Sequence, residues 1–132
     1  MITADSSIWI DYFRGGATAQ TEALDTVLND SAQELVLLDV VLMEVLRGFR
    51  FPHELRLAKQ ALSALPVVTA GGETVALLAA DIYRALRQKG LPVRSPIDLL
   101  VGAWCIHNDC DLVQNDRDYD GMVAFMGLRG GL

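Results

Sequence analysis

The sequence predicts an α/β fold in which a short, mostly parallel central sheet is flanked by helices in three layers. Short apolar runs alternate along the chain with longer segments of helical periodicity, and strands separated by helices form parallel βαβ units with right-handed crossovers. One run, "ELVLL", shows no polar and apolar alternation, which is typical of a strand buried on both faces. The length of 132 residues suits one domain, so we expect a single domain over residues 1–132.

The first predicted elements follow from the apolar start of the chain. Residues 2–5, "ITAD", are short and mostly apolar, which predicts a strand. Ser6 and Ser7 can cap the helix that follows, and "RGG" ends it. A second amphipathic helix is predicted over about residues 21–28.

The middle of the chain continues the alternation. The second predicted strand is "ELVLL", and Asp39 can cap the next helix, "VVLMEVLRGF". A further helix is predicted over roughly residues 52–65, and "PVVT" is predicted as a third short strand.

The remainder of the chain is predicted to hold two helices and two strands. They are a long helix at "ETVALLAADIYRALRQKG" with Gly90 as its C-cap, a helix at "SPIDLLVGAWCIH", a fourth strand at "DLVQN" and a fifth strand at "VAFMGL". In open sheets of this kind, functional groups gather at the carboxyl ends of the strands, and Asp5 and Asp116 both stand at that end.

Composition and charge exclude several classes of protein. Hydrophobic residues make up 52% and charged residues 21%, without a run of eighteen apolar residues, so we expect a soluble cytoplasmic protein that does not contact a membrane. Cys105 and Cys110 are too few for a disulfide framework or a zinc site, so reduced thiols are expected. The net charge of -6 argues against a nucleic-acid binder with an ordinary basic face, although bound divalent cations would make an acidic site locally cationic.

Two of the acidic residues stand where a carboxylate needs an explanation. Asp5 ends the first predicted strand, where a buried charge costs on the order of several kcal/mol unless it is paired or metal-bound. The alternative for Asp5 is a turn aspartate that accepts the amides of the next helix. Glu44 follows four apolar residues, so we expect its helix to be largely buried, and the alternative is an ion pair with Arg47 or Arg50.

Asp98 and Asp116 also have structural alternatives. The segment Ser95–Asp98 matches a capping box with proline at the first helical position, and the ionised carboxylate favoured at a helix start is also what a metal ligand must be. Asp116 ends the predicted strand at "LVQN", or else belongs to a solvated turn with Asp118 and Asp120. A calcium loop does not explain "DRDYDG", because its twelfth position is a glycine rather than a glutamate.

Taken together, these four acids can converge on one pocket. Mutual repulsion makes such a pocket unfavourable without cations, and oxygen-only ligands suit Mg²⁺ or Mn²⁺. The chemistry that such a pocket supports is metal-assisted phosphodiester hydrolysis, in which the metal lowers the pKa of a water and stabilises charge on the leaving oxygen.

Four segments of the chain resemble the acidic motifs of a known family. The segments "MITADSSIWIDYFRG", "VLMEVLRGFR", "SPIDLLVGAWC" and "LVQNDRDYDG" resemble those of PIN-domain endoribonucleases, specifically toxins of the VapBC toxin–antitoxin type, in order and spacing over nearly the whole chain. The departures are Ser6 where threonine is usual, Gln114 and Asn115 in place of the commoner Leu-Thr, and Tyr119 in place of phenylalanine.

The resemblance implies a PIN-like fold, an RNA substrate and a cognate antitoxin that blocks the site. It implies that the catalytic cluster is Asp5, Glu44, Asp98 and Asp116. Of these, Asp5, Asp98 and Asp116 are expected to bind Mg²⁺ or Mn²⁺, with Asp118 and Ser7 as auxiliary residues. The aromatic group of Trp9, Tyr12 and Phe13 is most often core in such a helix, but part of this face can receive the antitoxin or a second copy of the chain, and we expect a homodimer.

Two other interpretations compete with the nuclease. A phosphoreceiver domain has a similar size and an acidic Mg²⁺ pocket, but it requires adjacent acids after the first strand and a lysine at the end of a late strand. This chain has one acid there, and Lys59 and Lys89 lie in helical segments. The second alternative is an inactive acidic pocket in a domain that acts only as a regulatory partner.

Overall fold

The computed structural model describes residues 1–130 and contains helices and short strands in the predicted order. The elements are β1 (Ile2–Ala4), α1 (Ser6–Phe13), α2 (Ala19–Leu28), β2 (Leu37–Leu38), α3 (Asp39–Arg47), α4 (Pro52–Leu62), β3 (Val67–Val68), α5 (Glu73–Gln88), α6 (Pro96–His107), β4 (Asp111–Val113), the 3₁₀ turn η1 (Arg117–Tyr119) and α7 (Asp120–Phe125). No helix within residues 1–130 is both long and apolar enough to cross a membrane.

The strands form short parallel pairs. β1 pairs with β4 in the register Ile2 to Asp111, and β2 pairs with β3 in the register Leu37 to Val67. A parallel bridge between Ile2 and Leu35 joins the two pairs, so the spatial order is β3, β2, β1, β4. Helices separate the strands of each pair along the chain, α3 and α4 between β2 and β3 and α1 to α6 between β1 and β4, which allows the parallel pairing that the alternation in the sequence predicts.

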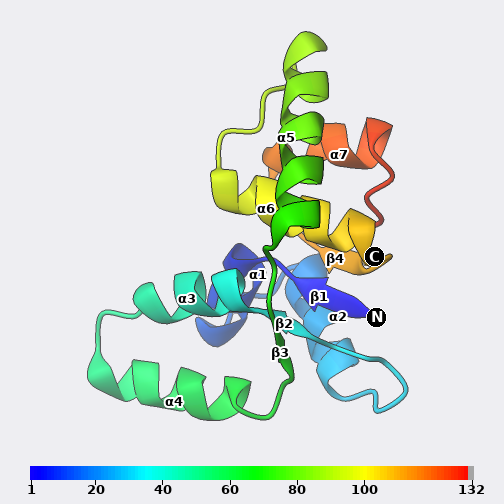
Figure 1. Ribbon diagram of the computed structural model, residues 1–132. Helices are drawn as coiled ribbons and strands as arrows, with labels where there is room; N and C mark the ends of the chain where they lie inside the picture. The colour runs from blue at the N-terminus through cyan, green and yellow to red at the C-terminus, as the bar shows by residue number, and fades with distance from the viewer. Residues whose placement is uncertain (131–132) are drawn as a thin grey trace.

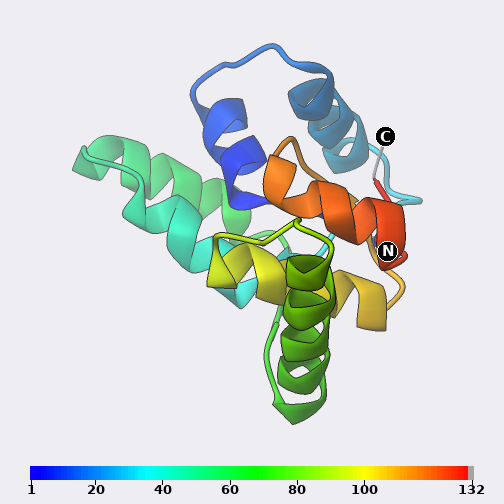
Figure 2. The same cartoon turned by 90° about the horizontal axis from the view of Figure 1, so that it is seen from above.

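Helices cover both sides of the strands. In Figures 1 and 2, α1 and α2 lie on one side and α5 and α6 on the other, and β4 contacts both α2 and α6. The core contains β1, the segment Leu35–Leu38 and the inner faces of the helices, with Trp9 and Tyr119 as its largest fully buried side chains. The predicted α/β fold with short parallel strands between helices is confirmed, and it places the ends of β1 and β4 next to the starts of α1 and α6.

The helix termini follow local sequence rules with three corrections. The prediction that Ser6 or Ser7 caps the first helix is wrong, because the N-cap of α1 is Asp5 and its side chain accepts no amide of that helix. Asp39 is likewise the first residue of α3 rather than its cap, and its Oδ1 accepts the N–H groups of Val40 and Ala70. The C-cap of α5 is Lys89 rather than the predicted Gly90, which follows it by one position, where its φ of +76° allows the paired terminal hydrogen bonds of a Schellman motif.

The predicted fifth strand at "VAFMGL" is wrong. Its first three residues, 123–125, end α7 and the other three form no strand, while Met122 of α7 is buried against α6 at Gly102. A Cβ at Gly102 would lie 2.2 Å from the Met122 Sδ, so the absence of a side chain there lets α7 approach. Strand-like pairing occurs just after this segment, where Gly130 bridges to Leu112 of β4 in parallel. The short apolar run could not distinguish these arrangements, because a buried helix and a buried strand share that composition.

The expectation of a largely buried helix around Glu44 is also wrong. Only Val41 and Val45 of α3 are buried, while Met43 is 46% exposed. The remaining apolar residues of α3 pack partly against the core. Of the apolar side chains of α3, Met43 is therefore the one left largely exposed.

Candidate active site

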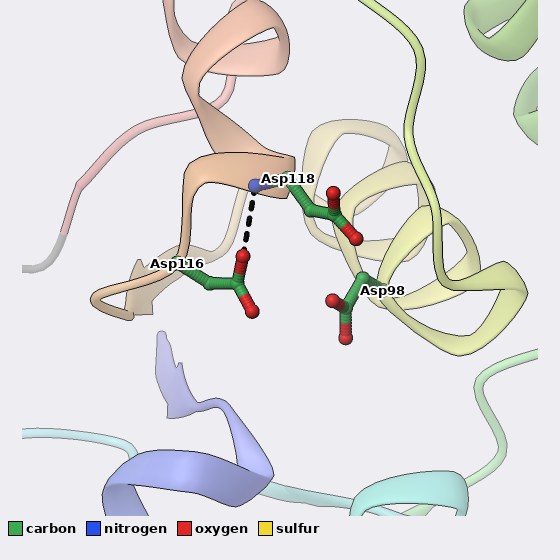
Figure 3. Close-up of side chains that lie close together, drawn as sticks. All are labelled: Asp98, Asp116 and Asp118. Atoms are coloured by element: carbon green, nitrogen blue, oxygen red, sulfur yellow. Dashed lines mark hydrogen bonds between the residues drawn. The ribbon is translucent and has the colours of Figure 1, made fainter.

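Three carboxylates meet at the opening between the start of α6 and the turn after β4. Asp98, Asp116 and Asp118 each offer an oxygen, and these oxygens lie within 4.8 Å of one another. Figure 3 shows Asp98 projecting from α6 toward Asp116 and Asp118, which come from the segment between β4 and α7. Asp98 is 8% exposed, whereas Asp116 is exposed and Asp118 half-buried, so the group reaches from the core edge to solvent.

The start of α6 fixes the position of Asp98. Ser95 is the N-cap and its Oγ accepts the N–H of Asp98 at 3.3 Å, while Pro96 occupies the first helical position. The carboxylate of Asp98 is left free by this cap, because it is the backbone amide that the serine binds. The predicted helix-start role and an outward-facing ligand role are therefore compatible in this geometry.

Asp118 joins the two segments that carry the other acids. Its Oδ1 accepts the N–H of Arg94 at 3.2 Å and its Oδ2 accepts the N–H of Ser95 at 3.1 Å. The N–H of Asp118 in turn donates to Asp116 Oδ1 at 2.9 Å, the bond drawn in Figure 3. Asp118 thus links the turn that holds Asp116 to the residues that start α6. Asp116 itself is exposed in that turn, as the alternative interpretation of this residue expected.

Asp5 approaches the group from the end of β1. It is 2% exposed, and its two oxygens accept the hydroxyl of Tyr119 and the hydroxyl of Ser7, each at 2.9 Å. Its side chain does not bind the amides of α1, so the alternative of an ordinary turn aspartate does not describe it. Asp5 is outside the group of three acids within 4.8 Å, but it lies close enough to raise the pKa of Asp98.

Glu44 faces the site from α3, which contacts both α1 and α6. The Ser6 hydroxyl donates to its Oε1 at 2.9 Å. Arg47 Nη2 lies 3.8 Å from its Oε2, but the Arg47 side chain is 70% exposed, and an exposed pair at this distance stabilises little. The ion pair proposed as the alternative for Glu44 is present, and the charge of Glu44 also contributes to the raised pKa of Asp98.

Burial and the negative charges of the other acids raise the pKa of Asp98. The pKa of Asp98 is raised from 3.8 to about 7, first by burial and then by the charges of Asp5, Asp116, Asp118 and Glu44. The pKa of Tyr119 is raised above its ordinary value, mainly by burial and by the charge of Asp5. Tyr119 therefore keeps its proton near neutral pH and donates it in the hydrogen bond to Asp5.

The residues fit a divalent cation. A hard cation such as Mg²⁺ takes carboxylate oxygens and usually binds through one or two carboxylates plus waters and substrate phosphates. Three carboxylate oxygens that face one another across less than 4.8 Å offer such a donor set. The raised pKa of Asp98 shows that this arrangement of negative charge is unfavourable on its own and would be relieved by a bound cation.

The sequence predicted Asp98 and Asp116, which the structure brings together, but it did not predict the groups that hold the acids. The hydroxyl of Tyr119 on Asp5, the hydroxyl of Ser6 on Glu44 and the amide of Arg94 on Asp118 were not predicted. Two sequence features could have indicated these donors. Ser6 directly follows Asp5, and Tyr119 carries a hydroxyl where the family pattern has phenylalanine.

Comparison with known proteins gives the family. The model of the PIN domain matches residues 2–123. The chain belongs to the PIN-domain family. Among curated relatives of this PIN domain, the VapC ribonuclease Mb1587 of Mycobacterium bovis and the ribonuclease VapC11 of Mycobacterium tuberculosis are each 28% identical over 129 residues, which is 98% of this chain and 96% of theirs.

Solved structures agree on the fold of this PIN domain. A chain of VapBC2 from Rickettsia felis, crystallised with a DNA fragment from its promoter, aligns with a TM-score of 0.76 at 17% identity, covering 98% of this chain and 96% of that one. A chain of a toxin–antitoxin complex from Klebsiella pneumoniae aligns with a TM-score of 0.65 at 16% identity, covering 100% and 98%. The resemblance to VapC-type PIN domains found in the sequence is confirmed.

Proposed function

We propose that this PIN domain is a metal-dependent endoribonuclease and the toxin of a VapBC-type toxin–antitoxin module. The observation that carries the proposal is the meeting of Asp98, Asp116 and Asp118, with oxygens within 4.8 Å, in a chain whose curated relatives are named VapC ribonucleases. Asp5 and Glu44 add their charges to the same field.

In this proposal, four acids, Asp5, Glu44, Asp98 and Asp116, form the catalytic cluster. Asp98 and Asp116 hold Mg²⁺ or Mn²⁺ together with Asp5, whose oxygens Tyr119 and Ser7 orient. When bound there, such a cation lowers the pKa of a water and stabilises negative charge on the leaving oxygen of a phosphodiester. Glu44, which Ser6 holds at one oxygen, orients the attacking water through the other.

Asp118 and Ser7 take auxiliary roles. A carboxylate has about four lone-pair sites, so the two amides bound to Asp118 leave it able to face the cation as well. Its main contribution is positional, because it fixes the separation of the segments that carry Asp98 and Asp116. Ser7 holds the second oxygen of Asp5 and so sets the direction of that carboxylate.

The proposal extends to partners. The structural neighbours from Rickettsia felis and Klebsiella pneumoniae belong to a VapBC pair and a toxin–antitoxin complex, which supports a cognate antitoxin for this chain. We propose that the antitoxin blocks the acidic site, that the toxin acts on RNA in the cytoplasm, and that it forms a homodimer. The apolar surface left exposed on α3, at Met43, is available for such contacts.

The test is incubation of the purified protein with total cellular RNA, in Mg²⁺ and in EDTA, followed by sequencing of the new RNA ends. New ends are expected in Mg²⁺ only. Asp98→Asn should not produce them, whereas Asp81→Asn, which removes an exposed charge on α5 away from the site, should. Undiminished cleavage in EDTA would contradict the metal role.

Absence of new ends with both Mg²⁺ and Mn²⁺ would favour the inactive regulatory alternative. The phosphoreceiver alternative lacks its lysine in this geometry, because β4 is followed by Gln114, while Lys59 lies in α4 and Lys89 is the C-cap of α5.

A further inference from the structure

A basic segment leads to the acidic site. Residues 84–94 contain four basic side chains and no acidic one, in a chain whose net charge is -6. The segment covers the last turns of α5 and the loop that Figure 1 shows running from the end of α5 to the start of α6. All four basic residues are exposed: Arg84, Arg87, Lys89 and Arg94.

At its end nearest the site, this segment meets a fifth basic residue. Arg94 and Arg117 line one pocket of about 250 Å³, and Asp118 of the acidic group lies in the wall of the same pocket. Arg117 is the first residue of η1, directly after Asp116. Two guanidinium groups therefore border the acidic site at the point where Asp118 joins its two segments.

Both guanidinium groups are available for a ligand. The ion pairs found within residues 1–130 involve Arg47 and Arg129, not Arg94 or Arg117. Among residues 1–130, Asp118 makes no ion pair with either arginine, and its side-chain oxygens accept the backbone amides of Arg94 and Ser95. Asp120, the other acid in the pocket wall, is exposed.

The chemistry of the proposed substrate gives these arginines a role. An RNA strand carries a negative charge on every phosphate. The proposed metal would contact only the scissile phosphate, so the acidic site would repel the phosphates on either side of it. Arginine binds phosphate oxygens bidentately through its planar fork of donors. A pair of free arginines beside the acids offsets this repulsion where a flanking phosphate would lie.

We propose that Arg94 and Arg117 form a phosphate-binding subsite for the RNA nucleotide next to the cleaved bond. The path continues along the end of α5 through Arg84, Arg87 and Lys89, where Arg84 and Arg87 line a further open pocket. This inference rests on the proposed ribonuclease function and adds to it the side from which the strand enters.

The experiment measures RNA binding without cleavage. Binding of a labelled single-stranded RNA of about 12 nucleotides is measured in EDTA between about 50 and 200 mM salt. The variants are Arg94→Gln with Arg117→Gln, and Arg84→Gln with Arg87→Gln. The matched control is Arg56→Gln with Lys59→Gln, which removes the same charge from exposed positions of α4, well apart from α5 in Figures 1 and 2.

The Arg94 and Arg117 variant is expected to bind RNA about tenfold or more weakly at low salt, since hydrogen bonds to charged groups are the stronger kind. The slope of log K against log salt should fall by about 1.4, because each phosphate contact on a single strand contributes about 0.7. The Arg84 and Arg87 variant should show a similar loss of slope, and the control should keep the parent values. Melting curves of all variants confirm that they are folded.

The outcomes separate this inference from the proposed function. If the parent cleaves RNA in Mg²⁺ but the Arg94 and Arg117 variant binds RNA as the control does, the subsite is wrong and the nuclease stands. If the parent binds RNA through these arginines but never cleaves it, the subsite stands and the nuclease is wrong. A parent that does not bind RNA at low salt overturns the subsite whatever its cleavage activity. In the cleavage assay, the subsite predicts a raised KM with kcat retained.

Discussion

Replacing Asp98 with asparagine is expected to stabilise the metal-free protein while removing its response to Mg²⁺. The reason is that Asp98 is buried among the charges of four other acids, and its pKa is raised to about 7. Asparagine has nearly the same shape and keeps the backbone amide that Ser95 accepts. The substitution therefore removes the unfavourable charge and leaves the helix cap in place.

The magnitude follows from the pKa. One pKa unit corresponds to about 1.4 kcal/mol, so the change from 3.8 to about 7 destabilises the folded state by about 4 kcal/mol near pH 8. Loss of a favourable charge at the start of α6 costs up to about 1 kcal/mol, and burial of an amide without a partner costs about 1 kcal/mol more. A net gain of about 2 kcal/mol remains, which is a rise in melting temperature of about 6 to 8 °C for a domain of this size.

The assay is a set of melting curves near pH 8, in EDTA and in excess Mg²⁺. Parent and Asp98→Asn are compared with Asp81→Asn, which lowers the net negative charge equally at an exposed position of α5. Mg²⁺ should stabilise the parent and the Asp81→Asn control, because a ligand that binds only the folded state raises its stability. The gain should be much smaller in Asp98→Asn.

A lower melting temperature for Asp98→Asn in EDTA, together with an undiminished Mg²⁺ response, would refute the reasoning. That result would mean that Asp98 acts chiefly as a favourable helix-start charge. An equal rise in Asp81→Asn would also refute it, since the gain would then come from net charge rather than from the site.

Four further predictions follow from the same geometry. Because the pKa of Asp98 is raised in the folded state, protonated Asp98 favours folding at low pH, and this contribution is lost between about pH 4 and pH 7. Between about pH 5 and pH 8 in EDTA, the free energy of unfolding of the parent, measured in urea, should therefore fall by about 2 to 3 kcal/mol more than that of Asp98→Asn. Glu44→Gln should abolish most RNA cleavage with little change in melting temperature, whereas Arg47→Ala should leave cleavage largely intact; unfolding of both variants would instead indicate a structural ion pair. Cleavage should be lost in EDTA and restored by Mg²⁺ or Mn²⁺ but poorly by Ca²⁺, whose looser coordination does not fix an attacking water, and equal rates in Ca²⁺ would contradict this. Asp118→Ala should weaken Mg²⁺ binding measured by calorimetry and destabilise the protein by about 1 to 3 kcal/mol, since two amides lose their acceptor, and a variant with parent stability would show that the two bonds do not hold the site.

The fold was largely predictable because local sequence patterns mark most of its helices and strands. The buried run Leu35–Leu38, the proline and serine at the start of α6 and the glycine after α5 each have one simple structural meaning. The segment at α7 did not, because its six helical residues are too few to show a helical period, and its burial depends on the space that Gly102 leaves in α6. Such a contact is long-range and has no local signature.

The acidic residues of the candidate site could be predicted from the sequence, but the groups that hydrogen-bond to them could not. Asp5, Asp98 and Asp116 could be recognised because a carboxylate at a strand end or in an apolar helix is unusual unless it has a partner or a function. The sequence predicts only an auxiliary role for Asp118, since nothing in it shows that the oxygens of Asp118 reach back to the amides of Arg94 and Ser95. Partners separated by more than twenty residues depend on how α6 and the turn after β4 meet, which only the folded chain determines.

The groups that hydrogen-bond to the acids of the candidate site share one property, which is that they carry no charge. Tyr119, Ser6 and Ser7 bind its carboxylates through neutral hydroxyls, and Asp118 is bound through backbone amides. Such donors fix the direction of a carboxylate without cancelling its charge. The basic side chain that approaches most nearly, Arg47, lies 3.8 Å from Glu44 and is mostly exposed. A buried arginine would have neutralised the cluster and occupied the oxygens, so a scaffold of neutral donors orients the acids and leaves them open to a cation from solution. In the proposed subsite, Arg94 and Arg117 lie outside the acids rather than among them, where they could attract a phosphate without competing for a bound cation.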